Sequence, residues 1–460
     1  MTTPPPGACI DDTVFALIRK YDRPGPRYTS YPPANHFSPE VDPARLIAAS
    51  AESTSPLSLY LHIPFCESLC WFCGCHTTIT LNRNKAQHYL DHLFAEIAQT
   101  ADRLQPGRLV DQVHLGGGTP NFLTPEQIRR LAGELRQHFT LTPDAEISAE
   151  LDPRILTEAH IEALRELGLN RASFGVQDSN PDVQKAVHRV QPPEMNERAM
   201  QWLREAGIGS VNIDLIYGLP LQTPEGFRAT LREVQALGPD RFAVFNYAHV
   251  PWMKPAQKLL ERHPLPQGDE KLTLLQTIVN ELTAGGFVYV GMDHFAKPDD
   301  ELVVAQRSGT LQRNFQGYST RAGAEILGLG ISSISQTADT YRQNHKELPV
   351  YQKAITEGEA PVSRGFMLSR EDQLRREVIM EIMCNLHLPF GSLAERWQLD
   401  PREHFAPELE ALQPMADDGL VEIAADGLHV TERGRWFLRN LAMPFDQYLA
   451  NAPGRYSRTV

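Results

Sequence analysis

Four of the six cysteines in this chain of 460 residues lie within ten positions of one another. They are Cys66, Cys70, Cys73 and Cys75. A secreted disulfide framework would spread cysteine pairs along a short chain, whereas crowded cysteines in a long chain indicate a metal or redox site. The other two, Cys9 and Cys384, have no partner nearby in the sequence, and we interpret them as ordinary thiols.

The first three of the crowded cysteines are spaced C-x3-C-x2-C, which admits three interpretations. On a helix they would share one face as a buried stripe of small residues, but Pro64 and Gly74 argue against a helix here. Structural zinc usually takes two separated ligand pairs, and only Cys75 and His76 are available nearby. An iron-sulfur cluster fits better, because a loop crossing one face of a cubane presents thiolates at short intervals. Three thiolates would leave one iron open to a ligand with an amine and a carboxylate.

From Leu57 onward, short β-rich runs alternate with longer helical patterns. The predicted strands are 57–63, 112–115, 145–151, 171–176, 211–217 and 241–247. Helical patterns between them include 85–101, 125–139 and 224–237. This alternation predicts strand-helix units around a parallel sheet, an α/β fold.

Glycine or polar side chains follow the predicted strands, and the carboxyl ends of parallel strands are where such folds place their chemistry. Gly116-Gly117-Gly118-Thr119-Pro120 follows the second strand. It is neither Gly-x-Gly-x-x-Gly nor a phosphate-binding loop, which disfavours an ordinary nucleotide-binding fold.

The two ends of the chain differ from this middle part. Residues 1–50 are Pro-rich and predict a draped arm. Residues 51–365 would form the catalytic domain. Residues 366–460 begin with a helical pattern and then place two short strands around Ala425-Asp426-Gly427, which predicts a hairpin in a winged-helix-like domain.

Composition excludes several classes of protein. Lys and Arg total 44 against 57 Asp and Glu, a net charge of −13, which has the wrong sign for a nucleic-acid binder. No apolar run reaches the roughly 18 residues of a membrane span, and Met1 to Asp12 lacks the features of a secretory signal. We therefore expect a cytoplasmic protein in which local Arg or Lys residues hold any anionic substrate.

The cysteine spacing, with Phe72 before the third cysteine, resembles the signature of the radical S-adenosylmethionine superfamily. Its glycine-rich segment is similar to Gly116–Pro120. Further segments resemble one family within it, the oxygen-independent coproporphyrinogen III oxidases, over nearly the whole chain. These segments are 25–32, Cys75, 175–178, 212–220, 245–249 and 292–295.

The resemblance implies a partial (β/α)6 TIM-like barrel with an amino-terminal arm and a smaller, mostly helical carboxyl-terminal domain. It implies that Cys66, Cys70 and Cys73 bind a 4Fe-4S cluster completed by S-adenosylmethionine, with a second S-adenosylmethionine beside the first. The contacts carried over for the first are Tyr60, Gly117, Glu150 and Ile334. Those for the second are Phe72, Gly118, Thr119, Gln177, Arg189, Asp214 and Ala248.

Each of these contacts has an ordinary structural alternative. A strand-end acid is often a turn or helix-cap residue, Gln177 could serve the backbone, Arg189 could be a surface charge and Ile334 could be core. Cys75 resembles a non-ligating residue needed for turnover, with a packed thiol as its alternative. Arg27 and Tyr28 are the residues predicted to help hold the substrate, because propionates need guanidinium partners.

The implied reaction turns two propionate side chains of coproporphyrinogen III into vinyl groups and gives protoporphyrinogen IX. It would start with one electron from a low-potential donor, flavodoxin- or ferredoxin-like, passed through the cluster to the sulfonium of S-adenosylmethionine. This breaks a carbon–sulfur bond and releases a 5′-deoxyadenosyl radical, which removes a propionate β-hydrogen. Loss of CO2 and of one electron then leaves the vinyl group. We expect a monomer, without nucleic-acid or membrane partners.

The sequence leaves two rival interpretations open. Haem-binding trafficking proteins of the same superfamily typically carry a His-Asn-x-x-Tyr-Trp motif, whereas residues 313–319 here read Arg-Asn-Phe-Gln-Gly-Tyr-Ser. They also usually lack the long arm and the Cys75 equivalent, so the comparison favours the oxidase. A structural protein held together by zinc is the other interpretation. Metal analysis would distinguish it from the iron-sulfur enzymes.

Overall fold

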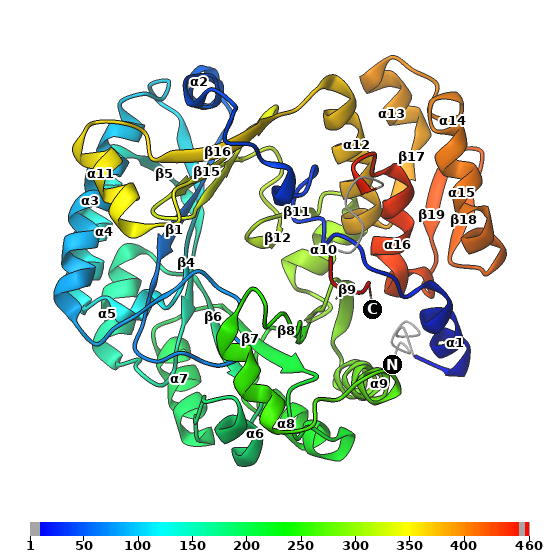
Figure 1. Ribbon diagram of the computed structural model, residues 1–460, viewed down its shortest axis with the longest axis horizontal. Helices are drawn as coiled ribbons and strands as arrows, with labels where there is room; N and C mark the ends of the chain where they lie inside the picture. The colour runs from blue at the N-terminus through cyan, green and yellow to red at the C-terminus, as the bar shows by residue number, and fades with distance from the viewer. Residues whose placement is uncertain (1–9, 450–455, 460) are drawn as a thin grey trace. The chain divides into compact units, whose positions relative to one another are not determined.

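The computed structural model describes residues 10–449 and 456–459, and Cys9 lies outside these ranges. Its contacts divide the chain into two compact units (Figure 1). The sheet unit comprises residues 37–274 and 323–367. The terminal unit comprises 1–36, 275–322 and 368–460, of which the described residues are discussed below. The predicted arm therefore divides between the units at His36, and the terminal unit also contains an internal segment of the chain.

The sheet unit is built on parallel strands whose spatial order is β13, β1, β4, β5, β6, β7, β8. Their bounds are Glu325–Leu329 for β13, Leu57–Ile63 for β1, Leu109–Gly117 for β4, Thr140–Leu151 for β5, Arg171–Gln177 for β6, Ser210–Tyr217 for β7 and Arg241–Asn246 for β8. All of the strands predicted between 57 and 247 are therefore present. The pairing in this unit runs as an open series rather than a closed ring, as expected for a partial barrel.

Helices follow the strands and line their outer side in Figure 1. They are α3 (Arg83–Ala101), α4 (Pro125–His138), α5 (Glu158–Leu167), α6 (Pro181–Ala186), α7 (Pro193–Glu205) and α8 (Pro224–Ala236). Local sequence sets where they begin: Thr124 and Gln127 form a capping box at the start of α4, and Thr223 caps α8 just before a proline. Leu59 and Leu131 are fully buried, so strands and helices share an apolar core.

Antiparallel strands extend the sheet beyond β13 and were not predicted. They are β14 (Ile334–Gln336), β15 (Thr340–Asn344) and β16 (Val362–Met367). This unit also contains α2 (Pro43–Glu52), α11 (Leu348–Thr356) and the short pair β2 (Phe65–Cys66) and β3 (Thr78–Ile79). β2 and β3 matter most for function, because they bracket the cysteine segment.

The terminal unit is mostly helical. Its elements include α1 (Asp12–Tyr21), most of α9 (Asp269–Ala284), β9 (Val288–Gly291), β10 (His294–Ala296), α10 (Glu301–Ser308), β11 (Gln312–Asn314), β12 (Gly317–Ser319), α12 (Arg370–Met380), α13 (Phe390–Trp397), α14 (Pro401–His404), α15 (Ala406–Asp417) and α16 (Leu438–Ala442). The predicted hairpin is confirmed as β18 (Val421–Ile423) and β19 (Gly427–Val430), and an unpredicted strand, β17 (His387–Pro389), pairs with β19. No helix in the described part of the chain is long and apolar enough to cross a membrane.

Candidate radical S-adenosylmethionine site

The cysteine segment is an irregular loop that leaves the carboxyl end of β1. Its ends are held together by β2 and β3, because Thr78 N–H donates to Pro64 O over 2.6 Å and Thr80 N–H to Cys66 O over 3.0 Å. Within the loop, Cys73 N–H donates to Cys70 O over 3.0 Å. The helical interpretation of the cysteine spacing is therefore wrong, and Pro64 was the correct signal against it.

The three thiols predicted to bind iron differ in their surroundings. Cys70 is buried, Cys66 and Cys73 are half-buried and Cys75 is exposed. Burial raises the pKa of Cys66 to about 11, and its thiol donates to Thr119 Oγ1 over 3.7 Å. A hydrogen bond from the Cys75 thiol lowers the pKa of Cys73 and raises that of Cys75 itself. The thiolate is thus already favoured at Cys73, whereas Cys66 needs a cation to become one.

Two guanidinium groups lie on the buried sulfur of Cys70. Arg154 Nη2 and Arg189 Nη1 are each 3.6 Å from Cys70 Sγ. Asp152 lies between them, 2.6 Å from Arg154 Nη2 and 3.5 Å from Arg189 Nη1. Burial would raise the pKa of Asp152, but the charges of Arg189 and Arg154 outweigh it and lower the pKa to about 2. The group therefore has a net positive charge beside the sulfur.

Arg189 had been predicted from the family resemblance, but Asp152 and Arg154 had not been predicted. The sequence did contain a signal, since both come within three residues of Leu151, at the carboxyl end of a predicted strand. Such an end is where polar residues of an α/β site gather. Only the fold shows that Arg154 reaches back to a cysteine 84 residues earlier.

The glycine-rich segment lies at the carboxyl end of β4, directly against the cysteine loop. Gly118 N–H donates to Ile63 O over 2.8 Å. A Cβ on Gly118 would lie 2.7 Å from Pro64 C and from Phe65 O, so any larger residue would push the loop away. Gly117 has φ 114°, a conformation that favours glycine, and its N–H donates to Glu150 Oε2 over 3.2 Å.

Tyr60 at β1 and Glu150 at β5 belong to one polar layer along this edge of the sheet. The Tyr60 hydroxyl lies 3.0 Å from His62 Nδ1, and the Tyr60 ring stacks on His114 with ring centroids 5.9 Å apart. His114 Nε2 in turn lies 3.5 Å from Glu150 Oε1. His62 and His114 were not predicted as part of the site, although they alternate with the apolar residues of their strands.

Gln177 is the last residue of β6, Arg189 lies in the loop between α6 and α7, and Asp214 lies within β7. Arg189 Nη2 donates to Gly175 O over 2.7 Å. Gln177 adopts φ 68°, and both its Oε1 and Arg189 Nε are buried without a hydrogen-bond partner. Because buried polar atoms normally have partners, the lack of one at these two atoms indicates that they are available to a polar ligand.

Asp214 is held by two donors and is only partly exposed. Asn212 Nδ2 donates to its Oδ1 over 2.7 Å and the Ser173 hydroxyl to its Oδ2 over 3.1 Å. Burial and the nearby Glu150 carboxylate raise the pKa of Asp214 to about 7, in spite of these hydrogen bonds. Its charge is therefore sensitive to any cation or donor that binds beside it.

The remaining predicted contacts are Phe72, Ala248 and Ile334. Phe72 packs against a buried cluster that includes Tyr247 and Leu260, and its carbonyl accepts from Gln257. Ala248 is exposed in the loop after β8. Ile334 is half-buried on β14, and a Cβ on Gly328 would lie 2.6 Å from the carbonyl oxygen of Ile334.

Arg27 and Tyr28 lie in the terminal unit, where each has a partner. Arg27 Nη1 is 3.5 Å from Asp293 Oδ2 and remains partly exposed. Tyr28 is buried, and its hydroxyl donates to Asp446 Oδ2 over 3.1 Å. The hydroxyl of Tyr28 thus has a structural role, whereas the guanidinium of Arg27 stays accessible.

Comparison with known proteins tests the family directly. A family model described as "Radical SAM superfamily" matches residues 60–234, which include the cysteine loop and the strand ends just described. The oxygen-independent coproporphyrinogen III oxidase of Synechocystis is 48% identical over 442 residues, covering 95% of both chains. This chain belongs to the oxygen-independent coproporphyrinogen III oxidases.

Other comparisons agree with membership in this oxidase family. The enzyme of the same name from Escherichia coli K12 is 48% identical over 439 residues, covering 95% of this chain and 96% of its own. A model described as "HemN C-terminal domain" matches residues 368–437 in the terminal unit. A solved structure of the E. coli coproporphyrinogen III oxidase, HemN, described as a radical SAM enzyme, superposes with a TM-score of 0.91 at 46% identity. That match covers 96% of this chain and 100% of the other. The α/β fold with its helical carboxyl-terminal part is confirmed by this match.

Proposed function

We propose that this chain carries out oxygen-independent oxidative decarboxylation of two propionate side chains of coproporphyrinogen III to vinyl groups, giving protoporphyrinogen IX for porphyrin synthesis. The observation that carries the proposal is near full-length identity of 48% to oxidases of that name. The haem-binding chaperone, our alternative, finds no support in these relatives.

Cys66, Cys70 and Cys73 would hold the 4Fe-4S cluster. Among the described residues, one group has three or more His, Cys, Asp or Glu ligand atoms that all lie within 4.8 Å of one another. None of these cysteines belongs to that group. A single tetrahedral zinc would need such close sulfurs, whereas cluster thiolates bind separate irons and lie farther apart. When bound, the cluster and S-adenosylmethionine supply the electron transfer and the radical that removes hydrogen.

The protein's own groups suit these cofactors. Arg154 and Arg189 place positive charge on Cys70 and offset the negative charge of a thiolate-bound cluster. For S-adenosylmethionine, the backbone of Gly117 gives close approach, and Gln177 Oε1 and Arg189 Nε offer an acceptor and a donor without other partners. Tyr60, Glu150 and Ile334 remain our proposal for the first S-adenosylmethionine.

A second S-adenosylmethionine would use the residues nearer β6, β7 and β8. The proposed contacts are Phe72, Gly118, Thr119, Gln177, Arg189, Asp214 and Ala248. Cys75 would bind no iron, because its thiol is committed to Cys73 Sγ and a fourth thiolate would fill the open iron. Its exposed position fits a role in turnover.

The substrate's carboxylates need a local positive charge on a chain whose net charge is −13. Basic residues beside the cysteine loop supply it, since Lys254 Nζ donates to Cys75 O over 2.8 Å and the backbone carbonyl of Lys346 lies 2.7 Å from His76 Nε2. Burial and the charges of Arg364 and Lys254 lower the pKa of Lys346, so each of these two cations lies close enough to Lys346 to repel it. We assign propionate binding to this basic cluster of Lys254, Lys346 and Arg364.

Arg27 in the terminal unit is retained as a further contact for propionate, since its side chain is partly exposed. An Arg27→Ala variant with unchanged substrate affinity and turnover would remove it from the proposal. We further propose a cytoplasmic monomer that takes electrons from a flavodoxin- or ferredoxin-like donor and binds neither nucleic acid nor membrane.

The proposal is tested by anaerobic reconstitution with iron and sulfide, followed by incubation with reductant, S-adenosylmethionine and coproporphyrinogen III. Protoporphyrin fluorescence after oxidation, together with 5′-deoxyadenosine, is the expected result. A loaded cluster with no tetrapyrrole decarboxylation, but stable haem binding, would instead support the chaperone.

A further inference from the structure

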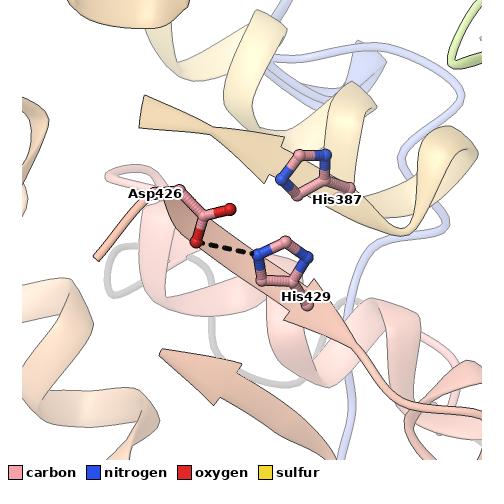
Figure 2. A group of neighbouring side chains, drawn as sticks. All are labelled: His387, Asp426 and His429. Atoms are coloured by element: carbon pink, nitrogen blue, oxygen red, sulfur yellow. Dashed lines mark hydrogen bonds and ion pairs between the residues drawn. The ribbon is translucent and has the colours of Figure 1, made fainter. Parts of the chain in front are cut away.

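Two histidines and an aspartate face one another on the small sheet of the terminal unit. His387 on β17 and His429 on β19 are directly opposite in the antiparallel register. Asp426 immediately precedes β19, in the turn between β18 and β19. Figure 2 shows both imidazole rings on the same side as the Asp426 carboxylate, with one nitrogen of each ring turned toward it. The three side chains therefore come from two strands and one tight turn.

The ligand atoms of this group are close together. The imidazole rings stack with centroids 4.3 Å apart at 17°, and His429 Nε2 is 3.2 Å from Asp426 Oδ1. One ligand atom from each residue lies within 4.8 Å of the other two, which holds for no other such group in the described part of the chain. Ligand atoms around a zinc with bonds of about 2.0–2.2 Å lie roughly 3.4 Å apart, so the His429–Asp426 pair already has a suitable separation.

A second observation points to a missing ligand. His387 Nε2 is buried and has no hydrogen-bond partner, although a buried ring nitrogen normally has one. Gly427 leaves the space beside it open, since a Cβ there would lie 3.2 Å from this nitrogen. The stacked ring can bring its nitrogen toward the other two atoms by rotating about χ2.

We propose that His387, Asp426 and His429 bind one divalent transition-metal ion, with zinc the best match. Two neutral imidazoles and one carboxylate suit zinc, whereas magnesium and calcium prefer oxygen ligands alone. The Asp426 side chain is 73% exposed and that of His429 38%, so the ion can reach the site and keep a water as its fourth ligand. Such an ion would join β17 to the β18–β19 turn.

The test is zinc binding by the anaerobically reconstituted full-length holoenzyme. The protein is dialysed against micromolar zinc, and zinc and iron are counted per chain in wild type, His429→Gln, Asp426→Asn and His404→Gln. His404 is the matched control, because it pairs with a carboxylate of Glu371 in the same unit but belongs to no such group of three. Any zinc taken up by the cysteine loop is common to all four proteins and cancels in the comparison.

Wild type and His404→Gln should bind one more zinc ion per chain than His429→Gln. Asp426→Asn, which changes only an exposed side chain, should weaken that zinc by at least about tenfold in competition with a chelator. Equal zinc content and affinity in all four proteins would show that the histidines are a stacked structural pair and would overturn the proposal.

Discussion

At the scale of single residues, the least expected feature is the pair of guanidinium groups on one cysteine. Arg154 and Arg189 each approach Cys70 Sγ at 3.6 Å. Positive charge and hydrogen bonds at a cluster sulfur favour the more negative, reduced cluster and so raise its reduction potential. The cysteines themselves could be predicted from their spacing, but Arg154 could not, because its distance to Cys70 depends on how β5 and β1 are placed in the sheet.

We therefore predict that Arg154→Gln makes the reduction potential of the bound cluster more negative, by on the order of tens of millivolts. Arg154→Lys, which keeps the charge, should shift it less. Arg129→Gln serves as the control, because Arg129 pairs with Glu166 on the surface. Spectroelectrochemical titration of the loaded enzymes measures the effect, and equal potentials in all three variants and wild type would refute it.

A second residue-scale prediction concerns Asp214, whose folded-state pKa is about 7 against an ordinary value of 3.8. Folding favours the protonated acid, so its stabilising effect is complete below about pH 4 and is lost as pH rises to about 7. The loss is on the order of a few kcal/mol, reduced by the partial exposure of the carboxyl group. Asp214→Asn should remove this part of the pH dependence.

The comparison uses the free energy of unfolding in urea for the protein without S-adenosylmethionine, between about pH 4 and pH 8. Wild type should lose more stability over this range than Asp214→Asn does. Parallel curves for the two proteins would mean that Asp214 has an ordinary pKa in the folded state.

At the scale of elements, the strand ends create the site. The parallel strands from β1 to β8 could be predicted because apolar runs alternate with capped helical patterns, which is a local property of the sequence. β13 could not be predicted as the neighbour of β1, since it pairs Leu57 with Glu325 across more than half of the chain. The short strands β14, β15 and β16 were missed because they have little periodicity of their own.

The contact between the glycine-rich segment and the cysteine loop leads to a prediction about stability. In Gly118→Ala, the added methyl would meet the backbone at Pro64 and Phe65 within 2.7 Å and cost about 1–3 kcal/mol. Because the loop must shift, iron loading should also fall. Gly133→Ala on an exposed face of α4, where a Cβ meets nothing within 4 Å, should instead stabilise by about 0.5–1 kcal/mol.

Urea unfolding and iron content per chain measure both variants. A Gly118→Ala protein as stable and as fully loaded as Gly133→Ala would show that the cysteine loop does not depend on this close approach.

At the scale of the whole molecule, charge is the main constraint. A chain with a net charge of −13 must bind a substrate with several carboxylates, and overall composition shows only that local cations are required. Which cations they are depends on the fold, because 92 positions of the sequence separate Lys254 from Lys346. Their grouping beside Cys75 was not predicted.

We predict that Lys346→Gln raises KM for coproporphyrinogen III by about tenfold while the cluster remains fully loaded, since one charge-assisted contact contributes roughly 1.5–3 kcal/mol. Lys353→Gln is the control, because Lys353 on α11 is exposed and pairs with Glu357 just after that helix. Steady-state kinetics at several ionic strengths measure the effect. Equal KM values for the two variants would move propionate binding away from this basic cluster.

Release of CO2 from carboxyl-labelled coproporphyrinogen III measures whether the cysteine loop supports radical decarboxylation of this substrate. The assay is run without oxygen on reconstituted wild type, Cys66→Ser and Cys384→Ala, with and without S-adenosylmethionine. Wild type and Cys384→Ala should release labelled CO2 only when S-adenosylmethionine is present, and Cys66→Ser should release none. Equal release by Cys66→Ser, or no release by a fully loaded wild type, would show that the cysteine loop does not support this reaction.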